Sequence, residues 1–206
     1  MKKCLMSLAL ILCCTINCTH LNAQIKVNKP IDKLMSSFVS VVIQKGQCSG
    51  VIVGESTVLT ALHCFVTENG LYDYGLIQDN LNIYGASINK ISGTNDLILL
   101  NVTTKFSKDR IAKLSKASVK LLDEVMIVAG IGKTLVLSKG TVNALTAPVQ
   151  NGTGGSYVML TAAVYYGMSG GAVYNSSGEL IALVHAFMGQ FTLITDLNAI
   201  QKILEN

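Results

Sequence analysis

Ser169 lies among three glycines in the segment YGMSGG, residues 166–171. Glycine has no Cβ, so such a segment can turn sharply and let a substrate approach the backbone closely. A serine hydroxyl on this turn could act as a nucleophile, but at neutral pH it needs a base within hydrogen-bond reach. An ordinary turn would also explain the glycines. A nucleophilic role for Ser169 therefore requires that the sequence contain a suitable base elsewhere.

Two histidines follow residue 23, His63 and His185, and histidine is the side chain best suited to act as that base. His63 comes after a strand-like segment and directly before Cys64. A carboxylate normally orients the base, and Asp96 is the candidate because it precedes the apolar run Leu97–Leu100. A carboxylate beside so apolar a strand is expected to be partly buried, which requires a hydrogen-bonding partner.

The amino terminus has the pattern of a secretory signal peptide. Lys2 and Lys3 precede the apolar run Leu5–Cys14, and the small residue Ala23 marks the cleavage position that we predict. A transmembrane anchor would need about 20 apolar residues, and the residues before Cys18 fit a lipidation signal poorly. We therefore expect a secreted or periplasmic protein without stable membrane insertion.

Cleavage would leave two cysteines, Cys48 and Cys64, of the six in the 206-residue sequence. One pair in an exported chain predicts one disulfide, with two unpaired buried thiols as the alternative. The formal net charge of +4 falls to +2 when Lys2 and Lys3 leave. So small a charge gives no electrostatic reason to expect a nucleic-acid partner. No cluster of ligand residues suggests a metal, and no phosphate-binding loop suggests a cofactor.

The rest of the chain consists of short segments rich in β-branched residues and separated by Gly, Asn, Ser and Asp, which predicts strands joined by turns. Strands at this spacing without intervening helices indicate a sandwich or barrel. Only the last segment, 196–205, predicts a helix, capped by Thr195 or Asp196. The stretch 149–156 predicts a surface loop. The predicted strands are 38–43, 49–54, 57–60, 81–84, 97–102, 124–129, 140–145, 157–163, 172–174, 180–185 and 191–194.

Three segments together resemble the trypsin-like serine peptidases of the chymotrypsin fold. TALHC, which contains His63, is similar to their histidine motif, and NDLILL, which contains Asp96, to their aspartate motif. GMSGGAV around Ser169 is similar to their serine motif, and the order of the three residues is that of the family. From the serine onward the sequence also looks like the HtrA-type bacterial branch, although we expect no PDZ domain. The resemblance covers about residues 38–205.

This resemblance implies an all-β fold of two six-stranded antiparallel barrels, chymotrypsin-like, with a C-terminal helix. The peptidase domain would span 36–206, with one barrel at about 36–115 and the other at about 119–195. The signal peptide (1–23) and an N-terminal lead-in or short propeptide (24–35) would precede it.

The implied activity is that of a serine endopeptidase that cleaves protein or peptide substrates through an acyl-enzyme intermediate, without a cofactor. Ser169 would be the nucleophile, His63 the general base and acid, and Asp96 the residue that orients His63. The backbone N–H groups of Gly167 and Ser169 would form the oxyanion hole. The sequence does not indicate the oligomeric state, and we favour a monomer.

Met168 departs from the trypsin branch, in which an aspartate at this position pairs with a new amino terminus after zymogen cleavage. A methionine cannot accept that ammonium group. We therefore predict that this protein is not activated by insertion of an amino terminus, and that packing orders the loop around Ser169.

The expected substrate pocket contains Ala163, Val164, Val184 and His185. Ala163 stands six residues before the serine, at the base of the family's specificity pocket, and predicts a preference for small or apolar side chains before the scissile bond. His185 leaves two alternatives open: it could read an acidic substrate side chain, as in glutamate-specific relatives, or form a hydrogen bond near Asp96. Neighbouring strand residues face opposite ways, so a shift of one residue would exchange the alternatives.

Two other interpretations of the whole chain compete with the peptidase. A catalytically silent exported homologue that serves as a binding module would keep the fold without the activity. An esterase with an α/β-hydrolase fold fails because its histidine follows its serine and its strands alternate with helices.

Overall fold

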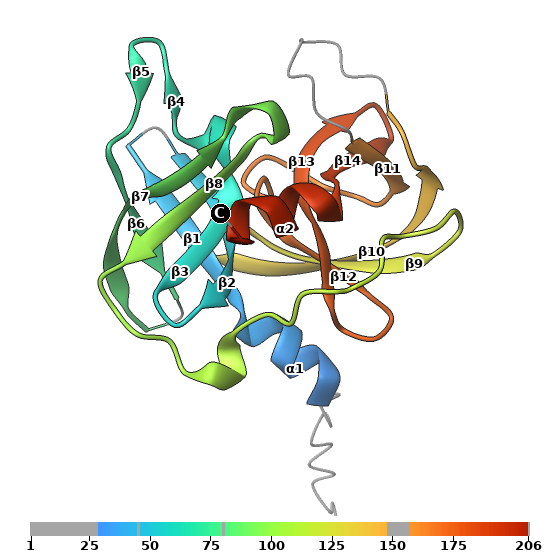
Figure 1. The fold of residues 1–206 in the computed structure, drawn as a ribbon, viewed down its shortest axis with the longest axis horizontal. Helices are drawn as coiled ribbons and strands as arrows, with labels where there is room; N and C mark the ends of the chain where they lie inside the picture. Colours follow the sequence, from blue (N-terminus) through green and yellow to red (C-terminus); the bar gives the residue numbers. More distant parts are fainter. Residues whose placement is uncertain (1–28, 45, 80, 148–156, 206) are drawn as a thin grey trace, which may run out of the picture.

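The computed structural model describes residues 29–44, 46–79, 81–147 and 157–205, so the predicted signal peptide (1–23) and the predicted loop at 149–156 lie outside the described residues. The described chain forms two closed six-stranded antiparallel barrels that lie side by side, which confirms the predicted fold (Figure 1). The first barrel contains, in order around the barrel, β1 (Phe38–Ile43), β2 (Gly46–Gly54), β3 (Thr57–Ala61), β8 (Leu97–Val102), β7 (Ile83–Ser92) and β6 (Tyr74–Gln78). The second contains β10 (Thr134–Ala144), β11 (Tyr157–Thr161), β14 (Phe191–Thr195), β13 (Leu180–Met188), β12 (Ala172–Asn175) and β9 (Glu124–Ile131).

Strand β8 shows how one apolar segment serves two hydrophobic cores. Successive side chains of a strand point to opposite faces. Ile98 and Leu100 therefore fill the interior of the first barrel, whereas Leu97 and Leu99 pack in a second core that both barrels share. Burial on both faces explains why polar and apolar residues do not alternate along Leu97–Leu100. It also fixes the position of Asp96, which directly precedes Leu97.

Helix α2 (Leu197–Glu205) closes the fold across the junction between the barrels (Figure 1). Ile200 and Ile203 are buried in the shared core, as the predicted apolar face requires. Asp196 caps the helix, because its Oδ1 accepts a hydrogen bond of 2.7 Å from Asn198 N. Within the described residues, no helix has the length and apolar character needed to cross a membrane.

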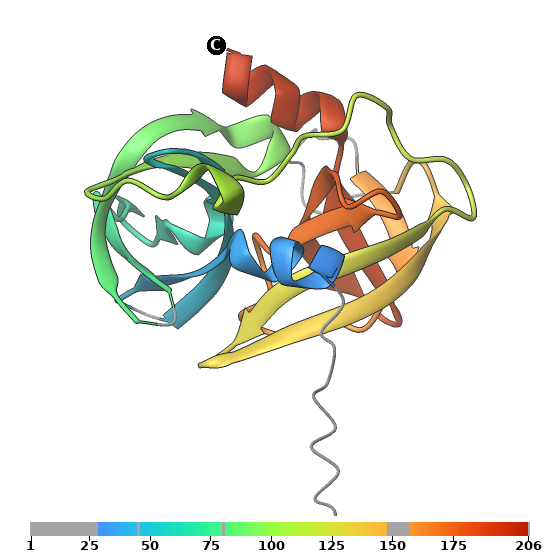
Figure 2. The same cartoon turned by 90° about the horizontal axis from the view of Figure 1, so that it is seen from below.

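Helix α1 (Lys29–Ser36) lies where the sequence predicted only a polar lead-in, and Figure 2 shows it running between the two barrels. Leu34 is buried in the shared core, and Arg110 Nε donates to the carbonyl oxygen of Ser36 at 2.9 Å. The spacing of Ile31 and Leu34 on one helical face was the available signal. A helix this short depends on packing against the barrels, which is why its own sequence gave a weak indication.

One predicted strand, 81–84, is wrong in position. Asp79 Oδ1 accepts hydrogen bonds from the N–H groups of Leu81 and Asn82, at 3.1 and 2.9 Å, and these bonds hold a turn. β7 therefore starts at Ile83, and the unpredicted β6 (Tyr74–Gln78) precedes the turn. The other predicted strands overlap observed ones and differ at their ends. The shorter elements are η1 (Leu62–Cys64), β4 (Val66–Thr67), β5 (Gly70–Leu71), η2 (Gly93–Asn95) and η3 (Lys108–Arg110).

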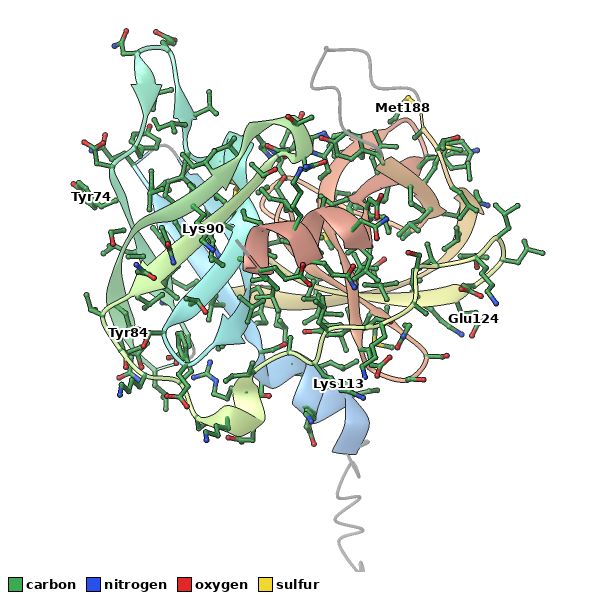
Figure 3. All side chains as sticks on the ribbon, in the orientation of Figure 1. Tyr74, Tyr84, Lys90, Lys113, Glu124 and Met188 are labelled. Carbon is green, nitrogen blue, oxygen red and sulfur yellow. A yellow bond between two sulfur atoms is a disulfide. The ribbon has the colours of Figure 1, made fainter. Side chains whose placement is uncertain are left out.

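The connection from β8 to β9 is fastened to the second barrel. Lys113 on this connection forms an ion pair of 2.6 Å with Glu179 (Figure 3). Leu180 N donates to Lys113 O at 2.7 Å, and Ser115 N donates to Leu180 O at 2.9 Å. These contacts and the shared core hold the barrels in one arrangement, which a site that draws residues from both barrels requires.

Candidate active site

The disulfide predicted from the two remaining cysteines is present beside His63. Cys48 in β2 is joined to Cys64 in η1, with an S–S distance of 2.04 Å. His63 is the middle residue of η1, so the bridge ties its backbone to the neighbouring strand. Closing a loop of this size contributes about 3 kcal/mol to stability in the chain-entropy account.

Asp96 occupies the turn between η2 and β8 and directs its carboxylate to His63. Its backbone is in the left-handed region, with φ 53° and ψ 43°, which aspartate tolerates better than most residues. Leu62 N donates to Asp96 O at 3.0 Å. Asp96 Oδ1 accepts a hydrogen bond of 2.7 Å from His63 N, and Oδ2 lies 2.6 Å from His63 Nδ1. The predicted buried carboxylate with a hydrogen-bonding partner is confirmed, since Asp96 is 5% exposed.

The charge of Asp96 is set by burial and by hydrogen bonds that act in opposite directions. Burial raises its pKa, but the hydrogen bonds from His185 and His63 and the charges of these histidines lower it more, from 3.8 to about 2. Asp96 is therefore ionised at neutral pH. An ionised carboxylate only accepts hydrogen bonds, so His63 Nδ1 donates to Asp96, which leaves Nε2 as the acceptor in the neutral form of the imidazole.

Ser169 lies on a turn of the second barrel whose main chain is held on both sides. Its carbonyl oxygen accepts a hydrogen bond of 2.8 Å from Ser49 N, and Gly170 N donates to Val184 O at 2.8 Å. Gly170 has φ +77°, and a Cβ at this position would collide with Ser49 O. Ser169 and His63 line the same cavity of about 520 Å³.

Met168 is completely buried in the core of the second barrel. Tyr165 N donates to the Met168 sulfur at 3.3 Å, Met168 N donates to Tyr165 O at 3.1 Å, and Met168 O accepts a bond of 2.9 Å from Gly171 N. The methionine thus anchors the segment before Ser169 by packing. That the protein needs no inserted amino terminus stays a prediction.

Ser49 is a supporting residue that the sequence reasoning missed. It is fully buried, and its Oγ donates to Gly167 O at 2.9 Å while accepting a hydrogen bond of 2.8 Å from Gly130 N. The hydroxyl therefore joins β2 of the first barrel to β9 and to the serine turn of the second. A serine between Cys48 and an apolar strand was the only signal in the sequence.

The four residues of the predicted substrate pocket lie in three different places. Ala163 and Val164 line a groove of about 580 Å³, whereas Val184 is buried in the core of the second barrel. His185 Nδ1 lies 2.6 Å from Asp96 Oδ2. Of the two alternatives for His185, the structure thus shows the hydrogen bond to Asp96.

Two aromatic residues that were not predicted flank the groove. Tyr166 and Phe187 meet edge to face with ring centroids 5.5 Å apart. Phe187 precedes Met188, which lies at the tip of the β13–β14 hairpin (Figure 3). Tyr166 lines both the groove and the cavity that contains His63 and Ser169, so it stands between the two.

His63, Asp96 and His185 also present three potential metal-ligand atoms within 4.8 Å of one another. The two nitrogen–oxygen separations of 2.6 Å are hydrogen-bond distances. Two ligands of a tetrahedral zinc ion, each about 2.0–2.2 Å from the metal, would lie about 3.3–3.6 Å apart. In this arrangement, the two histidines are therefore placed to donate hydrogen bonds to Asp96.

Comparison with known proteins agrees with this geometry. A family model of the trypsin-like peptidase domain matches residues 48–183, which is about two thirds of the chain. No curated protein matches the sequence.

Solved structures of low sequence identity share the fold. The active form of the Rv3671c protease from M. tuberculosis is 14% identical with a TM-score of 0.74, over 86% of this chain and 83% of that one. The MamO protease domain from Magnetospirillum magneticum is 22% identical with a TM-score of 0.69, over 84% and 97%. The serine endoprotease from Yersinia pestis is 18% identical with a TM-score of 0.71, over 86% and 65%.

Proposed function

The chain belongs to the trypsin-like peptidase family, and on that premise we propose that it is a serine endopeptidase whose triad is Ser169, His63 and Asp96. The observation that carries the proposal is the pair of hydrogen bonds, 2.7 and 2.6 Å, from His63 to the ionised Asp96. The bond from Nδ1 selects the tautomer that a base needs, and the bond from the backbone N–H holds the carboxylate beside the ring, in the cavity that Ser169 also lines.

The proposed reaction has two steps through one covalent intermediate. Ser169 Oγ attacks the peptide carbonyl carbon while His63 Nε2 takes the hydroxyl proton. His63 then gives this proton to the leaving amine, the C–N bond breaks, and an ester on Ser169 remains. Water attacks the ester with His63 again as base, which releases the carboxylic acid and restores the serine. Asp96 stays ionised throughout and stabilises the imidazolium.

The oxyanion of each tetrahedral intermediate is assigned to the backbone N–H groups of Gly167 and Ser169. Two sets of contacts support this assignment. The hydrogen bonds from Ser49 to Gly167 O and to Ser169 O hold the main chain on the carboxyl side of both residues. The bond of 2.9 Å from Gly171 N to Met168 O holds the peptide plane that carries the Ser169 N–H. Losing one such donor typically lowers kcat by about 10²–10³-fold.

For specificity we propose that a small or apolar side chain precedes the scissile bond and is received by the groove that contains Ala163 and Val164. Among the described residues, the groove lining has no acidic side chain that could pair with a substrate Lys or Arg. Its one cationic residue, Lys139, pairs with Glu124 at 2.9 Å. Peptide p-nitroanilides that differ only at this position test the preference, and faster cleavage after Glu or Lys than after Ala or Val would contradict it.

A fluorophosphonate probe, which modifies an activated serine, tests the function itself. We expect it to label the wild type and the control Ser176→Ala, which removes an exposed serine of the same barrel, but not Ser169→Ala. Peptide hydrolysis should fall by about 10⁶-fold in Ser169→Ala. A wild type that takes up no probe would favour the silent binding module, and labelling that persists without Ser169 would refute the assigned nucleophile.

The disulfide is typical of proteins in an oxidising compartment. We propose that the protein reaches the periplasm or the exterior after cleavage behind Ala23. The mass of the mature amino terminus, measured on protein from the culture medium or the periplasm, tests this proposal.

A further inference from the structure

Two imidazoles converge on a single oxygen of Asp96. His63 Nδ1 and His185 Nδ1 each lie 2.6 Å from Asp96 Oδ2. Because the ionised carboxylate only accepts hydrogen bonds, both histidines carry their proton at Nδ1. With the His63 backbone N–H on Oδ1, three N–H groups surround one buried carboxylate.

A bulge in β13 places His185 at this position. β13 pairs Val184 with Ile194 and Ala186 with Leu193, so His185 is the extra residue between two successive pairs. A bulge redirects a side chain, and bulges are frequent beside active sites. The alternation of strand faces therefore could not indicate from the sequence which way His185 points.

Packing holds the His185 ring in this orientation. The ring stacks on Tyr157, with centroids 4.2 Å apart and 23° between the planes, and meets the His63 ring edge to face at 5.7 Å. The His185 side chain is 13% exposed, against 42% for His63. Of the described residues, those that line the substrate groove and the His63 cavity do not include His185.

We propose that His185 is a positioning residue of the catalytic triad, which fixes the carboxylate of Asp96 and, through it, the orientation of His63. The proposal rests on the proposed function and gives His185 a role in the chemical step instead of in reading the substrate. Without His185, Oδ2 would keep one side-chain donor, and the carboxylate could rotate away from His63. A misplacement of about 1 Å can cost about 10²-fold in rate.

The burial of Asp96 gives independent support. A buried carboxylate is stable in its ionised form only when its oxygens are hydrogen-bonded. Of the interactions that lower the pKa of Asp96 against its burial, the hydrogen bond from His185 is the largest. His185 thus helps to keep Asp96 charged as well as oriented.

Two substitutions separate these roles. His185→Phe keeps a ring against Tyr157 but has no donor, whereas His185→Asn keeps an N–H donor near the position of Nδ1. With p-nitrophenyl acetate, we expect His185→Phe to lower the acylation rate by about 10- to 100-fold with KM within about twofold. His185→Asn should recover most of that rate. Equal rates in wild type and His185→Phe, or a loss seen only as a raised KM for a Glu-containing p-nitroanilide, would overturn the proposal.

NMR of an inactive variant tests the positioning role of His185 independently of the peptidase function. In Ser169→Ala protein labelled with ¹⁵N-histidine, we expect NMR to show Nδ1–H protons on both His63 and His185. Adding His185→Phe should shift and broaden the His63 Nδ1–H signal, and adding His185→Asn should restore it. An unchanged His63 signal in the Phe variant would refute the positioning role whether or not the wild type reacts with the fluorophosphonate.

Discussion

The two barrels hold their parts of the site by different kinds of interaction. In the first barrel, the ring and the backbone N–H of His63 both donate to the buried carboxylate of Asp96, at 2.6 and 2.7 Å. In the second barrel, the main chain of Ser169 is held by a bond of 2.8 Å from Ser49 N, and the buried Met168 anchors the preceding residue. The first region thus depends on a buried charge and its hydrogen bonds, and the second on apolar packing, main-chain bonds and the uncharged hydroxyl of Ser49.

This difference determines where a negative charge can lie beside the site. A buried charge is tolerated only when partners and hydrogen bonds compensate for its lost hydration. Asp96 has three N–H donors, whereas Met168 packs in the apolar core of the second barrel and its sulfur accepts one hydrogen bond, from Tyr165 N. A carboxylate at position 168 would therefore lack the set of hydrogen-bond donors that compensates for the burial of Asp96.

Met168→Asp tests this contrast most severely. It removes a buried apolar side chain and introduces a carboxyl group where apolar residues surround it. We expect the free energy of unfolding, measured by urea denaturation at pH 7, to fall by about 3–5 kcal/mol. We also expect the variant to lose most of its labelling by the fluorophosphonate probe. The loss should shrink as the pH falls, because a protonated carboxyl group is less costly to bury.

The matched control is Met168→Leu, which keeps the volume and the apolar character. It should cost less than about 1.5 kcal/mol and retain labelling. If Met168→Asp were as stable as the wild type, and its activity depended on a newly exposed amino terminus, the second region would be organised by charge and the contrast would be wrong.

The disulfide offers a smaller test in the first region. Cys48→Ala with Cys64→Ala removes the bridge but leaves the hydrogen bonds between His63 and Asp96. We expect unfolding to become easier by about 3 kcal/mol, a Tm lower by about 6–12 °C, and labelling of the folded protein within about threefold of wild type.

Calorimetry and probe labelling at 20 °C below the new Tm measure the two quantities separately. Wild type reduced under native conditions is the control, and it should resemble the double variant. A large loss of labelling at unchanged stability would show that the bridge, and not Asp96, positions His63.

The sequence predicted the parts of the site that short segments encode. Asp96 was recognisable because a carboxylate directly precedes a strand that is apolar on both faces, which implies burial and a partner. Cys48 and Cys64 were recognisable as a pair because the other cysteines fall in the predicted signal peptide. The resemblance of three motifs predicted the two six-stranded barrels, and both are present as closed barrels.

The features that could not be predicted from the sequence depend on contacts between segments that are distant in the chain. The bulge at His185 is defined by the register of β13 against β14, and no local pattern encodes it. Ser49 acts on Gly130 and Gly167, which are 81 and 118 residues away in the chain. α1 gains its stability from Leu34 in the core that both barrels share, so its helical pattern was too short to identify alone.

The pH dependence of stability gives the smallest expected effect and isolates the carboxylate of the first region. The folded protein holds the pKa of Asp96 at about 2, below its ordinary value of 3.8, because the hydrogen bonds from His185 and His63 outweigh the effect of burial. A depressed pKa stabilises the fold above pH 3.8, and the contribution is lost as the pH falls through 2. We expect Asp96 alone to account for about 2 kcal/mol of the stability lost between pH 5 and pH 2.

Urea unfolding of wild type and Asp96→Asn at both pH values measures this share, since an amide at position 96 does not titrate. The wild type should lose about 2 kcal/mol more than the variant over this interval, and the two should approach each other in stability near pH 2. If wild type and Asp96→Asn lost stability equally, Asp96 would be no more stabilised by its donors than an exposed carboxylate, and the first region would depend on packing as the second does.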